Sequence, residues 1–202
     1  MNRCYIIGAG DFNTVIEPDE GDLVIAADGG FDHLIRIGAR CDLLVGDLDS
    51  IKDVPTGVEV VRFPVRKDET DMHLAYLEGA SRGYRDFYIL GGTGGREDHT
   101  FANYCLLLYI ADRGHSARLL SDTGEVQILK NSKITLTGEP MKHLSLFPFG
   151  GVAHGVSVSG AEYECEGITL DPCFPLAVSN RFLDKEVNIS VLCGALLVMK
   201  EF

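Results

Sequence analysis

The first 121 residues alternate short apolar runs with segments of helical spacing, and this alternation restricts the fold more than any other feature. The strand-like runs are CYIIG, LVIAA, DLLVG, VEVVRF, FYILGG and ARLLS. Between two of them, Phe101, Tyr104, Cys105 and Leu108 follow the i, i+3, i+4, i+7 spacing of a helix. Parallel strands need crossover helices of this kind. The sequence therefore predicts an α/β domain with a parallel sheet.

The pattern changes at about Val126, where short alternating strands replace the helical segments. The new runs are KITLTG, LSLFPF, GVSVSGAEYEC, VNISVL and ALLVMK, separated by Gly, Pro and Asn turns. Little helical signal remains there. We therefore expect residues 1–125 to form an α/β domain and residues 126–202 to form a second, all-β domain.

Charge and composition exclude several classes of function. The net charge of −12 argues against binding to nucleic acid or to anionic membranes, because both are polyanions. No apolar stretch approaches the roughly 20 residues of a transmembrane helix, and the first residues lack the features of a signal peptide. The six cysteines include no C-x-x-C pair, which favours buried free thiols over disulfides or zinc ligands. We expect a cytoplasmic protein.

Polar residues follow several of the predicted strands, where an open parallel sheet binds its ligands. Asp28 follows one strand in VIAADGG, and Asp47 and Asp49 follow another in LLVGDLDS. The remaining positions come from FPVRKDETD and FYILGGTGGREDH, and they are Lys67, Asp68, Asp71, Arg96, Asp98 and His99. We take these residues as the candidate site.

Each motif alone is compatible with turn chemistry. Asp-Gly is a common turn, Asp49-Ser50 can cap a helix, and Asp68 with Asp71 resembles a capping pair. Carboxylates gathered at one sheet edge repel one another, however, and a shared divalent cation removes that conflict. Asp47 and Asp49 point to the same side of an extended segment, and carboxylate oxygens suit Mg²⁺. The cluster therefore predicts a site for Mg²⁺ and phosphate.

The residues around GGTGG supply what a phosphate needs. Its glycines let backbone N–H groups approach the ligand closely, and the N-terminus of the next helix adds a favourable dipole. Arg96 and Lys67 can supply positive charge.

A rival interpretation comes from IIGAGDFN, which approximates the G-x-G-x-x-G signature of dinucleotide-binding proteins. Asp28 lies 20 residues after Gly8, where such proteins place an acid for the ribose. This would make the chain an NAD-dependent oxidoreductase. Asn13 replaces the third glycine, and NAD binding leaves GDLDS, KDETD and GGTGGREDH unexplained. The sequence contains no Walker-type G-x-x-x-x-G-K-[ST] motif.

The order ADGG, GDLDS, KDETD and GGTGGREDHTFAN, followed by a β-rich tail with SN, resembles the thiamine pyrophosphokinase (thiamin diphosphokinase) family along essentially the whole chain. The resemblance implies a Rossmann-like nucleotide-binding domain followed by a β-sandwich, and a homodimer. It also implies transfer of the diphosphate of ATP to thiamine with Mg²⁺, which releases AMP.

The resemblance assigns roles to individual residues. It implies that Asp47, Asp49 and Asp71 hold Mg²⁺ and the ATP phosphates. Asp98 would lie close to the reacting groups and to thiamine, while Ser179 and Asn180 would contact thiamine across the dimer interface. The residues expected to contact or flank ATP are Asp28, Lys67, Asp68, Thr70, Arg96 and His99.

Two features depart from the family. Arg181 follows the SN pair where the family commonly has Glu, and the chain contains no Trp to stack on thiamine. Phe182 and Phe174 are the candidates to replace that Trp.

The expected reaction is attack of the thiamine hydroxyl on the β-phosphorus of ATP, so catalysis rests on positioning and charge neutralisation, with Arg96 among the catalytic residues. Either Asp71 or Asp98 would accept the hydroxyl proton. A pyrophosphokinase for another alcohol, such as a hydroxymethyl pterin, and a nonenzymatic nucleotide sensor remain as alternatives.

Overall fold

The structure is a computed structural model that describes residues 2–47, 56–64 and 68–202. Its contacts divide the chain into two compact units. The first comprises Met1–Leu106 and His115–Asp122, and the second comprises Leu107–Gly114 and Thr123–Phe202. The domain limits expected from the sequence, 1–125 and 126–202, stay a prediction.

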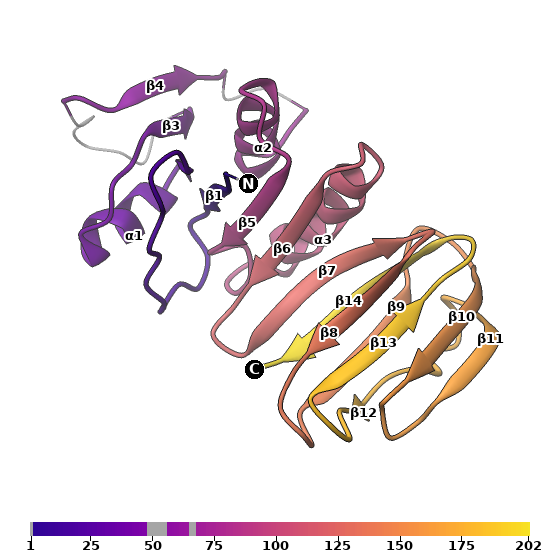
Figure 1. The fold of residues 1–202 in the computed structure, drawn as a ribbon. Helices are drawn as coiled ribbons and strands as arrows, with labels where there is room; N and C mark the ends of the chain where they lie inside the picture. The colour runs from indigo at the N-terminus through magenta and orange to yellow at the C-terminus, as the bar shows by residue number, and fades with distance from the viewer. Residues whose placement is uncertain (1, 48–55, 65–67) are drawn as a thin grey trace. The chain divides into compact units, whose positions relative to one another are not determined.

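The strands of the first unit form a parallel sheet, as the sequence predicts (Figure 1). Their order is β6-β5-β1-β2-β3-β4. On one side of β1 the sheet continues through β2 and β3 to β4. On the other side of β1 it continues through β5 to β6. The strands are β1 (Cys4–Ile7), β2 (Leu23–Ala27), β3 (Leu43–Gly46), β4 (Glu59–Arg62), β5 (Asp86–Leu90) and β6 (Ser116–Leu120). The order reverses between β1 and β5, where sheets of this kind bind ligands.

In the part of the chain that the structure describes, three helices connect these strands, and their ends follow from local sequence. Helix α1 (Gly30–Ile37) ends at Gly38, whose φ of +67° suits glycine. Helix α2 (Asp71–Ser81) begins after Thr70, whose hydroxyl accepts a hydrogen bond from the His73 N–H at 3.2 Å. The cap is therefore Thr70 rather than the pair of Asp68 and Asp71. Helix α3 spans Glu97–Ala111.

Helix α3 lies where the spacing predicts it, but the predicted apolar face is wrong. Phe101 is 59% exposed and Cys105 is also exposed. The buried positions are Asn103, Leu106, Leu107 and Ile110. The sequence from 104 to 111 is apolar on most sides of the helix, so two interleaved sets of residues both satisfy helical spacing.

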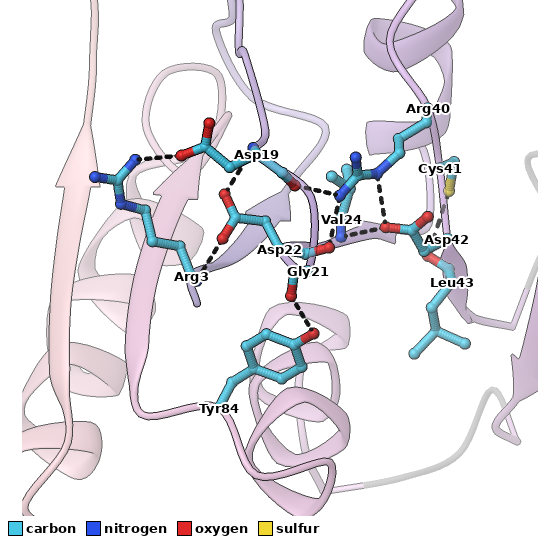
Figure 2. Close-up of polar contacts among 10 residues, drawn as sticks. All are labelled: Arg3, Asp19, Gly21, Asp22, Val24, Arg40, Cys41, Asp42, Leu43 and Tyr84. Carbon is cyan, nitrogen blue, oxygen red and sulfur yellow. Dashed lines mark hydrogen bonds and ion pairs between the residues drawn. The ribbon is translucent and has the colours of Figure 1, made fainter. Parts of the chain in front are cut away.

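A polar network ties together the amino ends of strands β1, β2 and β3 (Figure 2). Asp22, which is 7% exposed, accepts hydrogen bonds from the Arg3 N–H at 2.7 Å and the Asp19 N–H at 3.0 Å. Asp42 accepts the Val24 N–H at 2.8 Å, and Arg40 donates to the Asp22 carbonyl at 2.6 Å. This edge of the sheet satisfies its charges internally, which indicates a structural role.

Apart from the last residues of α3, the second unit is built of β-strands, which pair antiparallel in the orders β12-β9-β14-β7 and β11-β10-β13-β8. Side chains from both sheets, among them Leu136, Leu146, Val156, Ile189 and Leu196, form one buried cluster. The strands are β7 (Gly124–Lys130), β8 (Lys133–Thr137), β9 (His143–Pro148), β10 (Ala153–Ser159), β11 (Cys165–Leu170), β12 (Asn180–Arg181), β13 (Glu186–Ser190) and β14 (Ala195–Glu201).

Two sequence expectations about the chain are corrected. The run GVSVSGAEYEC is not one strand, because β10 ends at Ser159 and β11 begins at Cys165. All six cysteines are free, but Cys105, Cys173 and Cys193 are exposed rather than buried. In the described ranges, no helix has the length and apolar character needed to cross a membrane.

Candidate active site

A pocket of about 330 Å³ lies in the first unit, at the carboxyl ends of β1 and β5. Ala9 and Gly10 line it from the loop after β1, and the loop after β5 contributes Gly91, Gly92, Gly94, Gly95 and Arg96. Met72 from α2 and His99 and Asn103 from α3 complete the wall. The pocket thus occupies the point at which the strand order reverses.

The two loops are bound directly to each other. The N–H groups of Gly8, Gly10 and Asp11 donate to the carbonyls of Leu90, Gly91 and Thr93 at 2.8, 2.8 and 2.7 Å. A Cβ on Gly10 would lie 2.2 Å from the Thr93 oxygen. Gly91 has φ +62°, and a Cβ there would lie 2.3 Å from the Gly8 oxygen. Both contacts are too short for any side chain, so these positions require glycine.

Helix α1 holds the β1 loop from the opposite side. His33 Nε2 lies 2.9 Å from the Gly10 carbonyl oxygen, so this nitrogen carries the proton and donates. The His33 ring stacks on Phe12 with centroids 5.1 Å apart, and Arg36 donates to the Phe12 carbonyl. The loop after β1 is therefore fixed on both sides.

Arg96, Asp98 and His99 lie together at the start of α3. The Arg96 guanidinium binds both carboxylate oxygens of Asp98, at 2.5 and 3.1 Å, and the His99 N–H donates to the same carboxylate at 3.0 Å. The hydrogen bond from Arg96 holds the pKa of Asp98 below its usual range. Both side chains are mostly exposed. Arg96 is thus an accessible cation at the rim of the pocket, and Asp98 is a weak base while the pair persists.

The acidic residues after β2 and β3 lie at neighbouring strand ends. The Asp28 N–H donates to the Val45 carbonyl at 2.8 Å, and a Cβ on Gly46 would lie 3.2 Å from the Asp28 Cβ. Asp47 comes directly after Gly46. Asp28 has φ +45°, a conformation uncommon for residues other than glycine that often marks functional sites.

The remaining predicted residues of the first unit either lie at or just before the start of α2, or lie outside the described residues. Asp71 is the first residue of α2 and precedes Met72 in the pocket wall, while Asp68 is exposed before it. Asp49 and Lys67 lie outside the described residues. Among the residues that are described, no three His, Cys, Asp or Glu side chains form a group spaced for a metal ion. The magnesium assignment, which includes Asp49, stays a prediction.

Ser179 and Asn180 lie in the second unit and have distinct environments. Asn180 is 7% exposed. Its side chain accepts the Tyr163 N–H at 2.9 Å and donates to the Tyr163 carbonyl at 2.8 Å. Ser179 is exposed, has φ +60°, and donates its N–H to the Ser145 hydroxyl at 3.0 Å. Asn180 therefore fixes the backbone of Tyr163, and Ser179 presents its hydroxyl on a strained backbone.

The structure decides between the two aromatic candidates for stacking. Phe182 is fully buried, with its ring 2.8 Å from the position of a Cβ on Gly138, so the suggestion that it stacks on a ligand is wrong. Phe174 is 66% exposed and remains a candidate. Tyr163, which no sequence motif marks, is 67% exposed beside Asn180.

Sequence reasoning missed the role of the glycines after β1 and two pocket residues on the helices. Gly8 and Gly10 fit a dinucleotide-binding signature, but two glycines after the central strand also mark a close approach to a neighbouring loop. Met72 and Asn103 line the pocket from helices. Asn103 ends the motif GGTGGREDHTFAN, but its place in the pocket wall, like that of Met72, depends on how the two helices pack.

Comparisons with known proteins give a consistent result. The family model "Thiamin pyrophosphokinase, catalytic domain" matches residues 18–119, and "Thiamin pyrophosphokinase, vitamin B1 binding domain" matches residues 131–196. The chain is 25% identical over 212 residues to the thiamine pyrophosphokinase of Bacillus subtilis (strain 168), covering 99% of each chain.

Solved structures share the fold. The crystal structure of the Bacillus subtilis thiamine pyrophosphokinase aligns with a TM-score of 0.89 at 24% identity, covering 99% of each chain. The thiamin pyrophosphokinase of Geobacillus thermodenitrificans aligns with a TM-score of 0.85 at 21% identity, covering 99% of this chain and 97% of the other. A family protein from Enterococcus faecalis gives 0.86 at 24% identity, with 100% and 99% covered.

Proposed function

This chain belongs to the thiamin pyrophosphokinase family, and on that premise we propose that ATP binds in the pocket between the loops after β1 and β5. The activity is transfer of the diphosphate of ATP to the hydroxyl of thiamine, giving thiamine diphosphate and AMP. The family assignment sets aside the NAD-dependent oxidoreductase and the pterin pyrophosphokinase. The observation that carries the placement is the pocket at the point of strand-order reversal, with Arg96 and His99 at its rim.

Mg²⁺ is the proposed cofactor, and Asp47, Asp49 and Asp71 would hold it. The donor set fits, because carboxylate oxygens together with phosphate and water are the ligands that Mg²⁺ prefers. Asp47 comes after β3 and Asp71 begins α2, so both lie at the carboxyl edge of the sheet. When bound, the ion would neutralise charge on the phosphates.

The Arg96–Asp98 pair suggests how nucleotide binding prepares the site for reaction. A phosphate oxygen competes with Asp98 for the Arg96 guanidinium, which binds phosphates in the same two-pronged way. Once Arg96 moves to the phosphate, the effect that lowers the pKa of Asp98 is lost, and its carboxylate becomes a better acceptor for the thiamine hydroxyl proton. Arg96 then stabilises the charge that develops on the α,β-bridging oxygen. Asp98 thus becomes the favoured base, since Asp71 is assigned to the metal.

A substitution at Arg96 tests this placement. Arg96→Ala should raise the Kd for Mg-ATP about tenfold or more, because a charge-assisted hydrogen bond to phosphate is lost. Thiamine affinity should stay unchanged. Arg113→Ala is the matched control. Arg113 is an exposed arginine that follows the end of α3, and its guanidinium stacks on the Tyr109 ring. Separate calorimetric titrations of both ligands decide the outcome, and an effect confined to thiamine would contradict the placement.

The second unit is proposed to be a β-sandwich that binds thiamine at the interface of a homodimer. Ser179 and Asn180 would contact thiamine, either directly or through Tyr163, which Asn180 holds. Large apolar side chains that remain exposed nearby in sequence support an interface, because monomers rarely leave many such groups in water. They are Phe174, Leu176, Val178 and Leu183. The proposed cytoplasmic location stays a prediction.

Mixing two inactive variants tests the shared site. Asp49→Asn removes a metal ligand and Asn180→Ala removes a thiamine contact, so mixed dimers should contain one intact site and recover part of the activity. Subunit exchange must be shown independently, for example by mass spectrometry of isotope-labelled dimers. If exchange occurs and activity does not return, the thiamine site lies within one chain.

A further inference from the structure

Asn103 is a buried polar residue in the wall of the proposed ATP pocket. It lies on α3, is 5% exposed, and donates from Nδ2 to the Gly92 carbonyl oxygen at 2.7 Å. The carbonyl can only accept, so the side-chain atom that faces it must be the amide nitrogen. This bond joins the helix to the loop after β5.

Gly92 is tightly enclosed at this point. A Cβ on Gly92 would lie 2.6 Å from Leu119 Cδ1, 3.2 Å from Asn103 Nδ2 and 3.3 Å from Ile89 Cγ2. Strands β5 and β6 therefore confine the Gly92 backbone from one side, and Asn103 confines it from α3. The loop is anchored here before it turns toward the pocket.

The anchor at Gly92 constrains the next residues of the loop. The Gly92 carbonyl and the Thr93 N–H belong to one rigid peptide plane, so fixing the oxygen also fixes the N–H. Thr93 in turn accepts the Asp11 N–H at 2.7 Å. Gly94 and Gly95 have φ of +80° and +67°, a region that glycine adopts freely, so nothing intrinsic to them sets the course of the loop toward Arg96.

We propose that Asn103 is a positioning residue for the nucleotide: through Gly92 it holds the glycine loop, and hence Arg96, in the arrangement that receives the ATP phosphates. The inference rests on the proposed placement of ATP in this pocket. Asn103 acts through the loop rather than on the reacting atoms. Asp is unsuitable at this position, because an ionised carboxylate cannot donate to the Gly92 oxygen and would repel it.

Asn103→Asp provides a test with a readout that depends on the donor alone. The two side chains have nearly the same shape. At pH 8.5 the new carboxylate cannot donate, and the KM for ATP should rise about tenfold relative to the unsubstituted enzyme, the scale of one hydrogen bond. At pH 5.5 the buried carboxyl, whose pKa burial raises, is protonated and can donate again. The KM ratio should then fall toward one.

The ratio removes pH effects that both proteins share, including those of ATP itself and of the charged groups Arg96, Asp98 and His99 in the same site. A KM ratio that stays constant from pH 8.5 to 5.5 would overturn the proposal. Phe87→Leu is the stability control: Phe87 is fully buried in β5 and packs on Tyr76 and His115, outside the pocket wall. It should lower the melting temperature and leave the KM for ATP unchanged.

A second pair of variants applies if Asn103→Asp does not fold. Asn103→Ser and Asn103→Ala are close in volume, but only serine carries a donor. The serine variant should keep a Kd for Mg-ATP about threefold lower than the alanine variant, and equal values would overturn the proposal. Arg96→Ala separates the two levels of inference. If it leaves Mg-ATP binding intact, the pocket assignment fails; if it weakens binding while the Asn103 series has no effect, only the role of Asn103 fails.

Discussion

Gly91 is the position at which a single methyl group should separate the two loops of the proposed ATP pocket. Gly91→Ala adds a Cβ that would lie 2.3 Å from the Gly8 oxygen, on a backbone with φ +62°. Gly38, the residue that ends α1, has a nearly equal φ of +67°, but a Cβ there has nothing within 4 Å. Gly38→Ala is therefore a matched control, because the two substitutions differ only in what the new methyl group meets.

The expected free energies reflect that difference. Both variants carry the cost of a left-handed conformation, about 1–2 kcal/mol for alanine. In Gly91→Ala the loops must also move apart, which weakens the hydrogen bonds from Gly8 to Leu90 and from Gly10 to Gly91, both 2.8 Å long. Two such bonds contribute about 1–3 kcal/mol. We expect a total loss of about 2–5 kcal/mol for Gly91→Ala and about 1–2 kcal/mol for Gly38→Ala.

Thermal unfolding and Mg-ATP titration measure the two consequences. For a chain of this size, 1 kcal/mol corresponds to a shift of about 2–4 °C, so Gly91→Ala should lower the melting temperature roughly two to three times as far as Gly38→Ala. At a temperature where both variants are folded, only Gly91→Ala should lose affinity for Mg-ATP. Equal melting temperatures, or unchanged Mg-ATP affinity in Gly91→Ala, would refute the argued coupling between the loops.

Further predictions concern charge and burial elsewhere. Asp47→Asn should abolish turnover without loss of stability, because it removes a proposed metal ligand next to Asp28; activity at limiting Mg²⁺ near that of the unsubstituted enzyme would contradict this. Asp22→Asn, the same chemical change at the opposite edge, should lower the free energy of unfolding, measured in urea, by about 1–3 kcal/mol. The reason is that one of the two N–H groups bound by Asp22 would face an amide NH₂. The pKa of Asp98 is lowered, so its pair with Arg96 should be intact at neutral pH and be lost only as pH falls through that lowered value; carboxyl ¹³C shifts that titrate in the usual range would contradict this. Phe182→Ala should lower the free energy of unfolding, measured with denaturant, by about 3–5 kcal/mol, because Phe182 is fully buried. Phe174→Ala should leave it almost unchanged, because Phe174 is mostly exposed.

The sheet of the first unit was predictable because its information is local. The runs at β1, β2 and β3 are apolar at every position and are buried at every position, which is the pattern of strands covered on both faces. Polar residues that interrupt such runs mark their carboxyl ends. For that reason the sequence alone places Asp28, Asp47 and Arg96 at the correct edge.

The face of α3 and the role of Asn103 were not predictable, because they depend on packing between distant segments. Phe101 and Cys105 satisfy helical spacing as well as Leu106 and Ile110 do, and only the sheet determines which set is buried. The same holds for Asn180, whose side chain forms hydrogen bonds with the backbone of Tyr163, 17 residues earlier. Spacing within a segment does not encode such partners.

The two edges of the parallel sheet illustrate how similar residues acquire opposite roles. At the amino edge, Asp22 and Asp42 each accept hydrogen bonds from backbone N–H groups or from Arg40, so their charge stabilises the fold. At the carboxyl edge, Asp28 and Asp47 occupy neighbouring strand ends with a strained backbone at Asp28, where a bound cation would relieve their mutual repulsion. Replacing a carboxylate by its amide is therefore expected to change stability in opposite directions at the two edges. The direction of that change distinguishes structural acids from ligand-binding acids without an activity measurement.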